Sequence, residues 1–140
     1  MKNYLILFIL VLLSTLSFAQ DFKFKGKTSS IINQDFIRGE ETPDKVDEKN
    51  KKVNISFNGS TLLIGKESYK YMWHQNSKVN DAVQLNCIER VEDLDYPYID
   101  AKFELEFLPD DQVKIIHFRE TTATTFSKIF YTVNIIKTTK

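Results

Sequence analysis

Cysteine occurs only once among the 140 residues of this chain, as Cys87. A single thiol excludes an intrachain disulfide, the cross-link with which many small secreted domains compensate for a small core. It also leaves no cysteine near the N-terminus to which a lipid could be attached, so we expect no lipid anchor there. The fold must therefore be stabilised by the burial of apolar side chains.

Glycine is also scarce, and neither sign of charge is in excess. The four glycines form no phosphate-binding loop, dinucleotide fingerprint or nucleophile elbow, because these motifs need glycines at fixed spacing. Lysine plus arginine and aspartate plus glutamate number 19 each. A balanced chain lacks the strongly basic surface that binds nucleic acid or anionic lipid. Composition therefore argues against both kinds of partner.

Only one long hydrophobic run is present, YLILFILVLL at 4–13. Lys2 precedes it and Ser17-Phe18-Ala19, a small-x-small tripeptide, follows it, which is the three-part pattern of a cleaved signal peptide. The run is shorter than the roughly 20 apolar residues of a membrane span. We therefore predict a signal peptide over 1–19, one domain over 20–140, and export to the periplasm or the cell exterior. The content of Lys, Asn and Ile suggests a bacterial source.

The clearest local pattern predicts a β-hairpin around Asn58-Gly59. Val53, Ile55 and Phe57 alternate with polar residues, and Asn-Gly suits the two positive φ angles of a two-residue type I′ turn. Such a turn sets the pairs Phe57–Ser60, Ile55–Leu62 and Val53–Ile64. The apolar residues of the two strands then share one face.

A second hairpin is predicted around Pro109-Asp110-Asp111. Phe103, Leu105 and Phe107 alternate with charged residues before this turn. A three-residue loop sets the pairs Phe107–Val113, Leu105–Ile115, Phe103–His117 and Glu106–Lys114. A four-residue loop would oppose apolar and charged residues, so we favour the shorter one.

The rest of the chain also consists mostly of predicted strands. Alternation of apolar and polar residues predicts strands at 21–27, 69–74, 82–91 and 129–135. The stretch 28–40 fits either a helix or a broken strand, whereas the charged stretch 41–52 is expected to be a loop. About seven to eight short strands joined by turns are typical of an all-β fold. We expect a single antiparallel β-barrel or β-sandwich built from meander-like hairpins.

Residues that could carry chemistry are few. His74, His117 and Cys87 do not lie at the spacing of metal ligands. Cys87 falls on an apolar strand face, where a thiol acts as a small hydrophobe, and His117 is expected to face inward opposite Phe103. The acidic stretch 89–100 lacks the spacing and the glycine of a calcium loop. We therefore expect no catalytic residue, no metal and no cofactor.

Aromatic side chains are the best candidates for binding. Tyr69, Tyr71 and Trp73 should share one face of a strand, although an alternating aromatic strand is also typical of a core. Tyr96 and Tyr98 flank Pro97 in a predicted turn, which would expose them. Tyrosine and tryptophan are frequent in interfaces because they combine apolar area with a polar tip.

Two classes of function remain open. The first is a non-enzymatic binding or interaction module whose partner is an unknown protein. The alternative is a lipocalin-like carrier, in which a closed barrel of about eight strands holds one small apolar ligand, although the Gly-x-Trp of lipocalins is absent near Gln20. A small hydrolase that uses His74 or His117 is the outsider.

Overall fold

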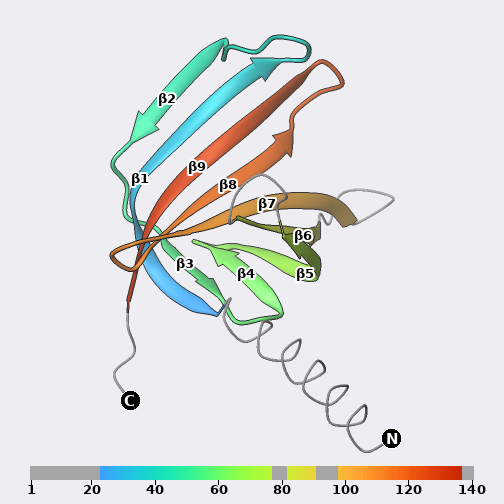
Figure 1. The fold of residues 1–140 in the computed structure, drawn as a ribbon. Helices are drawn as coiled ribbons and strands as arrows, with labels where there is room; N and C mark the ends of the chain where they lie inside the picture. The colour runs from blue at the N-terminus through green and yellow to red at the C-terminus, as the bar shows by residue number, and fades with distance from the viewer. Residues whose placement is uncertain (1–22, 77–81, 91–97, 137–140) are drawn as a thin grey trace, which may run out of the picture.

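The strands of the computed structural model, which describes residues 23–76, 82–90 and 98–136, curve into a closed antiparallel β-barrel (Figure 1). The strands are β1 (Phe24–Ile37), β2 (Lys45–Lys49), β3 (Asn54–Phe57), β4 (Thr61–Ile64), β5 (Glu67–Asn76), β6 (Val83–Arg90), β7 (Tyr98–Leu108), β8 (Gln112–Glu120) and β9 (Thr125–Ile135). From β3 to β9 each strand pairs with the next, and β9 pairs back with β1. Eight strands thus close the barrel, and β2 is an extra strand.

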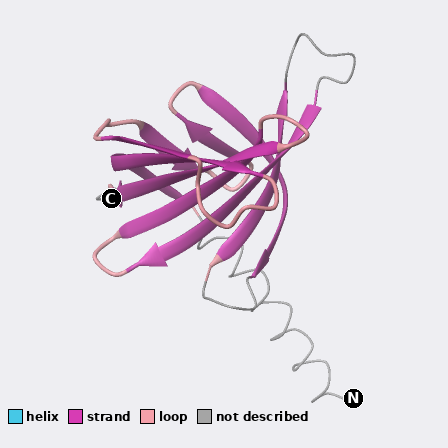
Figure 2. Cartoon of the chain, turned by 90° about the horizontal axis from the view of Figure 1, so that it is seen from above, coloured by secondary structure: helices cyan, strands magenta, loops and turns pink. Residues whose placement is uncertain are grey.

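This architecture confirms the all-β prediction and decides between its two versions, because a sandwich would not pair β9 with β1. Figure 2 shows strands and loops, without a helix, throughout the described residues. Within these same ranges we find no helix with the length and hydropathy of a membrane span. The predicted signal peptide over 1–19 lies outside the described residues.

Strand β1 gives the barrel its shape because it has two successive partners on one edge. Residues 24–27 pair with β3, whereas residues 31–35 pair with β2. The other edge pairs with β9, with a β-bulge between Thr28 and Ser30. Figure 1 shows β1, β9 and β8 extending past the short strands β3 and β4, with β2 along the outer edge. The ambiguous stretch 28–40 is therefore strand as far as Ile37.

The charged stretch 41–52, predicted as a loop, contains β2, so that prediction is wrong over Lys45–Lys49. Its burial pattern is almost wholly exposed, which explains why no apolar alternation marks it in the sequence. The hydrogen bonds that form this strand come from pairing with β1. A short, lysine-bearing edge strand is a common way to protect the edge of a sheet from further pairing.

The two predicted hairpins differ in outcome. The β7–β8 hairpin has the predicted register, including Phe103 opposite His117 and Phe107 opposite Val113. The β3–β4 hairpin is shifted by two residues, with Phe57 opposite Leu62 and Ile55 opposite Ile64. An even shift keeps every side chain on its predicted face, since the side-chain period of a strand is two.

The shift in the first hairpin has a local cause. A type I′ turn at Asn58-Gly59 would need positive φ at both residues, but only Gly59 has it, at 92°. The Asn58 side chain instead accepts hydrogen bonds from the backbone N–H groups of Ser60 (2.9 Å) and Thr61 (2.8 Å). An Asx-type turn of this kind moves the tip of the hairpin one residue further along the chain.

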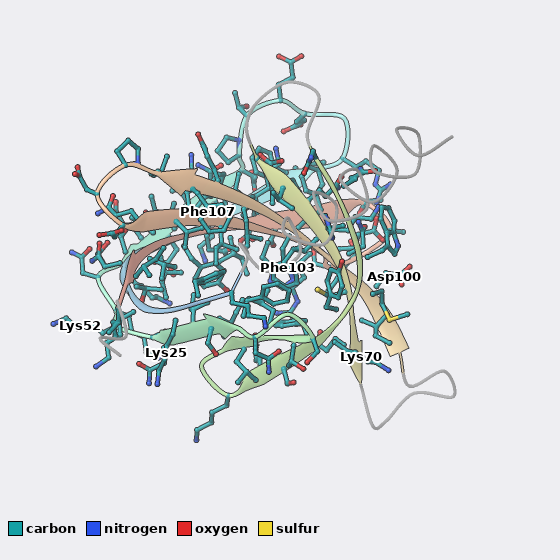
Figure 3. The ribbon with its side chains drawn as sticks, turned by 60° about the horizontal axis from the view of Figure 1, so that its bottom comes forward. Lys25, Lys52, Lys70, Asp100, Phe103 and Phe107 are labelled. Atoms are coloured by element: carbon teal, nitrogen blue, oxygen red, sulfur yellow. The ribbon has the colours of Figure 1, made fainter. Side chains whose placement is uncertain are left out.

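Large apolar side chains fill the closed part of the barrel. The fully buried ones on the inner face are Ile55, Leu62, Tyr69, Leu85, Phe103, Leu105, Val113, Ile115 and Val133. Figure 3 shows Phe103 among the side chains inside the barrel, whereas Lys25, Lys52 and Lys70 project from its outside. Burying each such apolar side chain stabilises the fold by about 1.5–3 kcal/mol. The barrel is therefore a packed core over most of its length.

Candidate functional site

The three aromatic residues predicted to share one face of β5 have separate environments. Tyr69 is only 1% exposed and packs against Phe103, with ring centroids 4.8 Å apart. Its hydroxyl donates a hydrogen bond of 2.8 Å to Glu67 Oε2. Burial, followed by this hydrogen bond, raises the pKa of Tyr69 above its usual value. Tyr69 therefore belongs to the core.

Trp73 lies on the outside of the barrel, so the prediction that it shares a face with Tyr71 is wrong. A β-bulge between Tyr71 and Trp73 makes Met72 an extra residue relative to β6. Trp73 is then paired with Asn86 and is 52% exposed. The side chain of His74, which regular alternation would place on the opposite face from Tyr71, forms a hydrogen bond with the Tyr71 hydroxyl.

The structure leaves the remaining aromatic candidates open. Tyr96 lies outside the described residues. Tyr98 is the first residue of β7, and its backbone is paired with Arg90. Its side chain is not among those that the structure describes. The five predicted binding residues are therefore not shown to form one site.

A pocket of about 310 Å³ lies where β1 changes partner from β3 to β2. Its lining comes from β1, β2, β4, β9 and the connection between β2 and β3: Ile31, Asn33, Asp47, Lys49, Lys51, Val53, Ile64, Ile129 and Tyr131. The volume is at the lower end of the range for small-molecule pockets, about 300–1,000 Å³. Apolar side chains and a few polar groups converge there, as in ligand sites generally.

Thr28 attaches the wall of this pocket to the barrel. Its hydroxyl donates to the Lys51 carbonyl at 2.5 Å and accepts from the Val53 N–H at 2.8 Å. The Thr28 N–H also donates to the Val53 carbonyl at 3.0 Å. Thr28 is almost fully buried beside the bulge of β1. These three bonds hold Lys51 and Val53 in place although neither belongs to a strand.

Asn33 presents an unused acceptor in the wall of the pocket. Its Nδ2 donates to Asp35 Oδ1 at 3.2 Å, and Ser127 Oγ donates to the same oxygen at 2.7 Å. These bonds orient the amide, whose buried Oδ1 has no hydrogen-bond partner among the described residues. A buried acceptor of this kind is commonly satisfied by a water molecule that donates a hydrogen bond.

Tyr131 contributes a phenol to the same pocket. Burial and then the negative charge of Glu67 raise the pKa of Tyr131 to about 12, with Arg119 acting in the opposite direction. The hydroxyl therefore keeps its proton at neutral pH. It forms no hydrogen bond with another described residue, so it can donate to a bound molecule.

Cys87 and His117, two of the three residues considered for catalysis, lie in the core, whereas His74 is half-buried on β5. Cys87 is 2% exposed, and burial raises the pKa of its thiol to about 12. His117 is 4% exposed and stacks on Phe103 at 4.4 Å. Among residues 23–76, 82–90 and 98–136, no three His, Cys, Asp or Glu side chains group as metal ligands. Neither side chain is in the lining of the pocket.

Sequence reasoning missed this pocket. Ile31 and Asn33 fall in the stretch that fitted two secondary structures, and Asp47, Lys49 and Lys51 fall in the predicted charged loop. No motif marks them, because strands far apart in the chain bring them together. In comparisons with known proteins, no family model, curated protein or solved structure matches this chain.

Proposed function

We propose that this protein is a non-enzymatic binding protein that holds one small molecule in the pocket between β1, β2 and β9. The observation that carries the proposal is the lining, in which Ile31, Val53, Ile64 and Ile129 supply apolar area beside unused polar groups. This proposal corresponds to the carrier hypothesis, in which the protein holds a small ligand. The site differs from a lipocalin-like cavity, because the ligand sits at the junction with β2 and the rest of the barrel is packed.

We also propose that the protein acts in the periplasm or outside the cell. The N-terminal pattern of Lys2, the apolar run 4–13 and Ser17-Phe18-Ala19 is the sole support for this location. A carrier in the periplasm or outside the cell would meet ligands that cross or leave the envelope. Native mass spectrometry of protein purified gently from its own host would reveal a bound small molecule as additional mass.

Filling the pocket tests the proposal directly. Ile129→Trp adds a large ring to the pocket wall contributed by β9, whereas Phe130→Trp places the same ring on the outer face of the same strand. We expect Ile129→Trp to lose the bound mass and Phe130→Trp to retain it, with both variants folded by circular dichroism. Wild-type protein without any bound molecule, or an Ile129→Trp variant that keeps it, would contradict the proposal.

A second candidate is the interaction module, which the exposure of Met72 (51%) and Trp73 (52%) favours. Exposed tryptophan is enriched among the residues that dominate protein interfaces. If a protein partner binds there, Trp73→Ala should weaken its capture from the host. Leu63→Ala, which truncates an exposed apolar side chain on the neighbouring strand β4, should leave capture unchanged. Equal capture by both variants would remove this surface from consideration.

A further inference from the structure

The charged side chains that line the pocket are two lysines and one aspartate: Asp47, Lys49 and Lys51. Lys49 Nζ lies 2.9 Å from Asp47 Oδ2, so these two charges are paired with each other. Lys51 forms no ion pair within the part of the chain that the structure describes. The lining therefore has a net charge of +1, located at Lys51.

The position of Lys51 is fixed at its backbone. The Thr28 hydroxyl holds the Lys51 carbonyl, and the neighbouring pairs between Thr28 and Val53 fix the chain on its other side. An ammonium group on an anchored backbone loses less freedom on binding a ligand than one on a flexible loop. The anchored backbone thus positions Lys51 to bind an anion.

The lining also includes apolar side chains. Ile31, Ile64 and Ile129 reach the pocket from three different strands. Hydrocarbon buried against such side chains contributes about 25 cal/mol per Å² of area removed from water. The Tyr131 hydroxyl adds a neutral donor, which suits an oxygen acceptor on the ligand.

We propose that the ligand is a small apolar monocarboxylic acid whose carboxylate binds Lys51 and whose hydrocarbon chain lies against Ile31, Ile64 and Ile129. This inference rests on the proposed function, since it names the ligand class of the same pocket. A carboxylate accepts charge-assisted hydrogen bonds from the ammonium, about twice as strong as neutral ones. The volume of about 310 Å³ favours a chain of medium length.

The test uses three probes with the same hydrocarbon chain and different head groups: sodium octanoate, 1-octanol and octylammonium chloride. Their dissociation constants are measured by calorimetry with the purified protein, after removal of any bound molecule, below the concentration at which they form micelles. We expect octanoate to bind about two- to fivefold more tightly than octanol, because Lys51 is exposed and solvent weakens its pairing with a carboxylate. Octylammonium should bind more weakly than octanol because its charge repels Lys51.

Two lysine variants assign the effect to one side chain. Lys51→Met should reduce octanoate affinity to the level of octanol while leaving octanol binding unchanged. Lys52→Met is the matched control, because Lys52 projects from the outside of the barrel and does not line the pocket (Figure 3). It should leave the affinities for all three probes unchanged.

The outcomes separate the two proposals. If octanol or octylammonium binds as tightly as octanoate, or if Lys51→Met keeps the preference for octanoate, the acid-binding inference is wrong although the pocket still binds ligands. If Lys52→Met abolishes the preference as Lys51→Met does, the assignment to Lys51 is wrong. If none of the probes binds, the acid-binding inference is wrong, and the bound mass found by native mass spectrometry decides separately whether the pocket holds another small molecule.

Discussion

Gly26 is the residue at which the barrel wall leaves no room for a side chain. It pairs with Ile55 on β3 and with Ile135 on β9. A Cβ atom built there would clash with the Asn134 carbonyl oxygen and lie 2.7 Å from Val133 Cγ1. Backbone atoms of a paired strand cannot move aside as the end of a side chain can. Glycine is therefore required here for close approach between strands.

We predict that Gly26→Ala destabilises the protein by about 1–3 kcal/mol, the usual cost of overpacking a well-packed interior. Urea unfolding followed by circular dichroism gives the difference. Lys27→Ala, at the next and outward-facing position, is the control and should change stability by less than about 0.5 kcal/mol. Equal losses of stability in both variants would show that the close contact at Gly26 is not the cause of the loss.

His117 makes stability depend on pH. Burial, with a further contribution from Arg119, lowers the pKa of His117 from the usual 6.5 to about 4, and Glu67 opposes this shift. Between these values the unfolded chain binds a proton that the folded chain does not. Stability is therefore lost as the pH falls through this window, and this contribution is fully present above pH 6.5.

We predict that lowering the pH from 7 to 4 costs the wild type about 3 kcal/mol more than His117→Phe, because one pKa unit corresponds to about 1.4 kcal/mol. Comparing the two proteins at each pH cancels the titration of the carboxylates. At pH 7 the variant should be at least as stable, since His117 Nδ1 is buried without a partner among the described residues. If the free energies of unfolding of the two proteins, measured with urea, changed with pH by the same amount, this account would be contradicted.

Single residues of the pocket could not be predicted from the sequence. Thr28, Lys51 and Val53 look like ordinary members of a strand and a charged stretch, and their hydrogen bonds join positions 23 and 25 residues apart. The spare acceptor on Asn33 depends on Asp35, and the Asp35 carboxylate is in turn bound by Ser127, 92 residues further along the chain. Neither composition nor spacing contains these contacts.

At the scale of elements, β5 shows how one extra residue changes which side chains face outward. Met72 interrupts the alternation, so Trp73 pairs with Asn86 rather than continuing the inward row of Tyr69 and Tyr71. A β-bulge does this because two residues on one strand oppose a single residue on its partner. Sequence alternation alone predicted the regular strand, in which Trp73 would share the face of Tyr71.

We predict that deleting Met72 leaves Trp73 exposed, because Tyr71 and Trp73 would then become neighbours and occupy opposite faces as they do now. The chain has one tryptophan, so quenching of its fluorescence by acrylamide reports its exposure directly. The variant should lose no more than about 1 kcal/mol of stability, the range of effects within strands. Deleting Lys70 instead should turn the rest of β5 over and destabilise the barrel strongly.

A protected tryptophan after deletion of Met72 would mean that the bulge does not set the orientation of this strand. A loss of stability equal to that of the Lys70 deletion would mean the same. Both results can be obtained from the two purified variants with the same quenching and urea-unfolding measurements.

Elements with strong local signals were predictable. The β7–β8 register followed from alternating residues and a three-residue turn in which Asp110 and Asp111 have positive φ. The β3–β4 faces were also predicted, although the Asn58 side chain moved the turn. The edge strand β2 was not predictable, because its residues are mostly exposed and its pairing depends on β1.

At the scale of the whole molecule, β1 and β9 bring the two ends of the described chain together, with pairs such as Gly26–Ile135. The junction where β1 exchanges β3 for β2 creates the pocket, so the candidate site is a property of barrel closure. A protein that lacks an intrachain disulfide must hold this closure by strand pairing and burial.

We predict that the protein is exported and begins at Gln20 in its mature form. Intact-mass measurement of protein from the envelope or medium of its host should match residues 20–140. Replacing Leu7 and Leu12 with Asp should keep the uncut chain inside the cell, since a signal peptide needs an unbroken apolar core. Uncut protein in the envelope, or normal export of this variant, would contradict the prediction.

The all-β class, the inward and outward rows of most strands and the exclusion of a disulfide could be derived from the sequence, because they depend on local alternation, turn residues and composition. The fold was needed to show that the sheet closes as a barrel, that the charged stretch contains β2, and that Trp73 faces outward. It also decided where a pocket is left between packed strands. These features arise from pairing between distant segments, whose free energy is shared among many residues and is encoded at no single position.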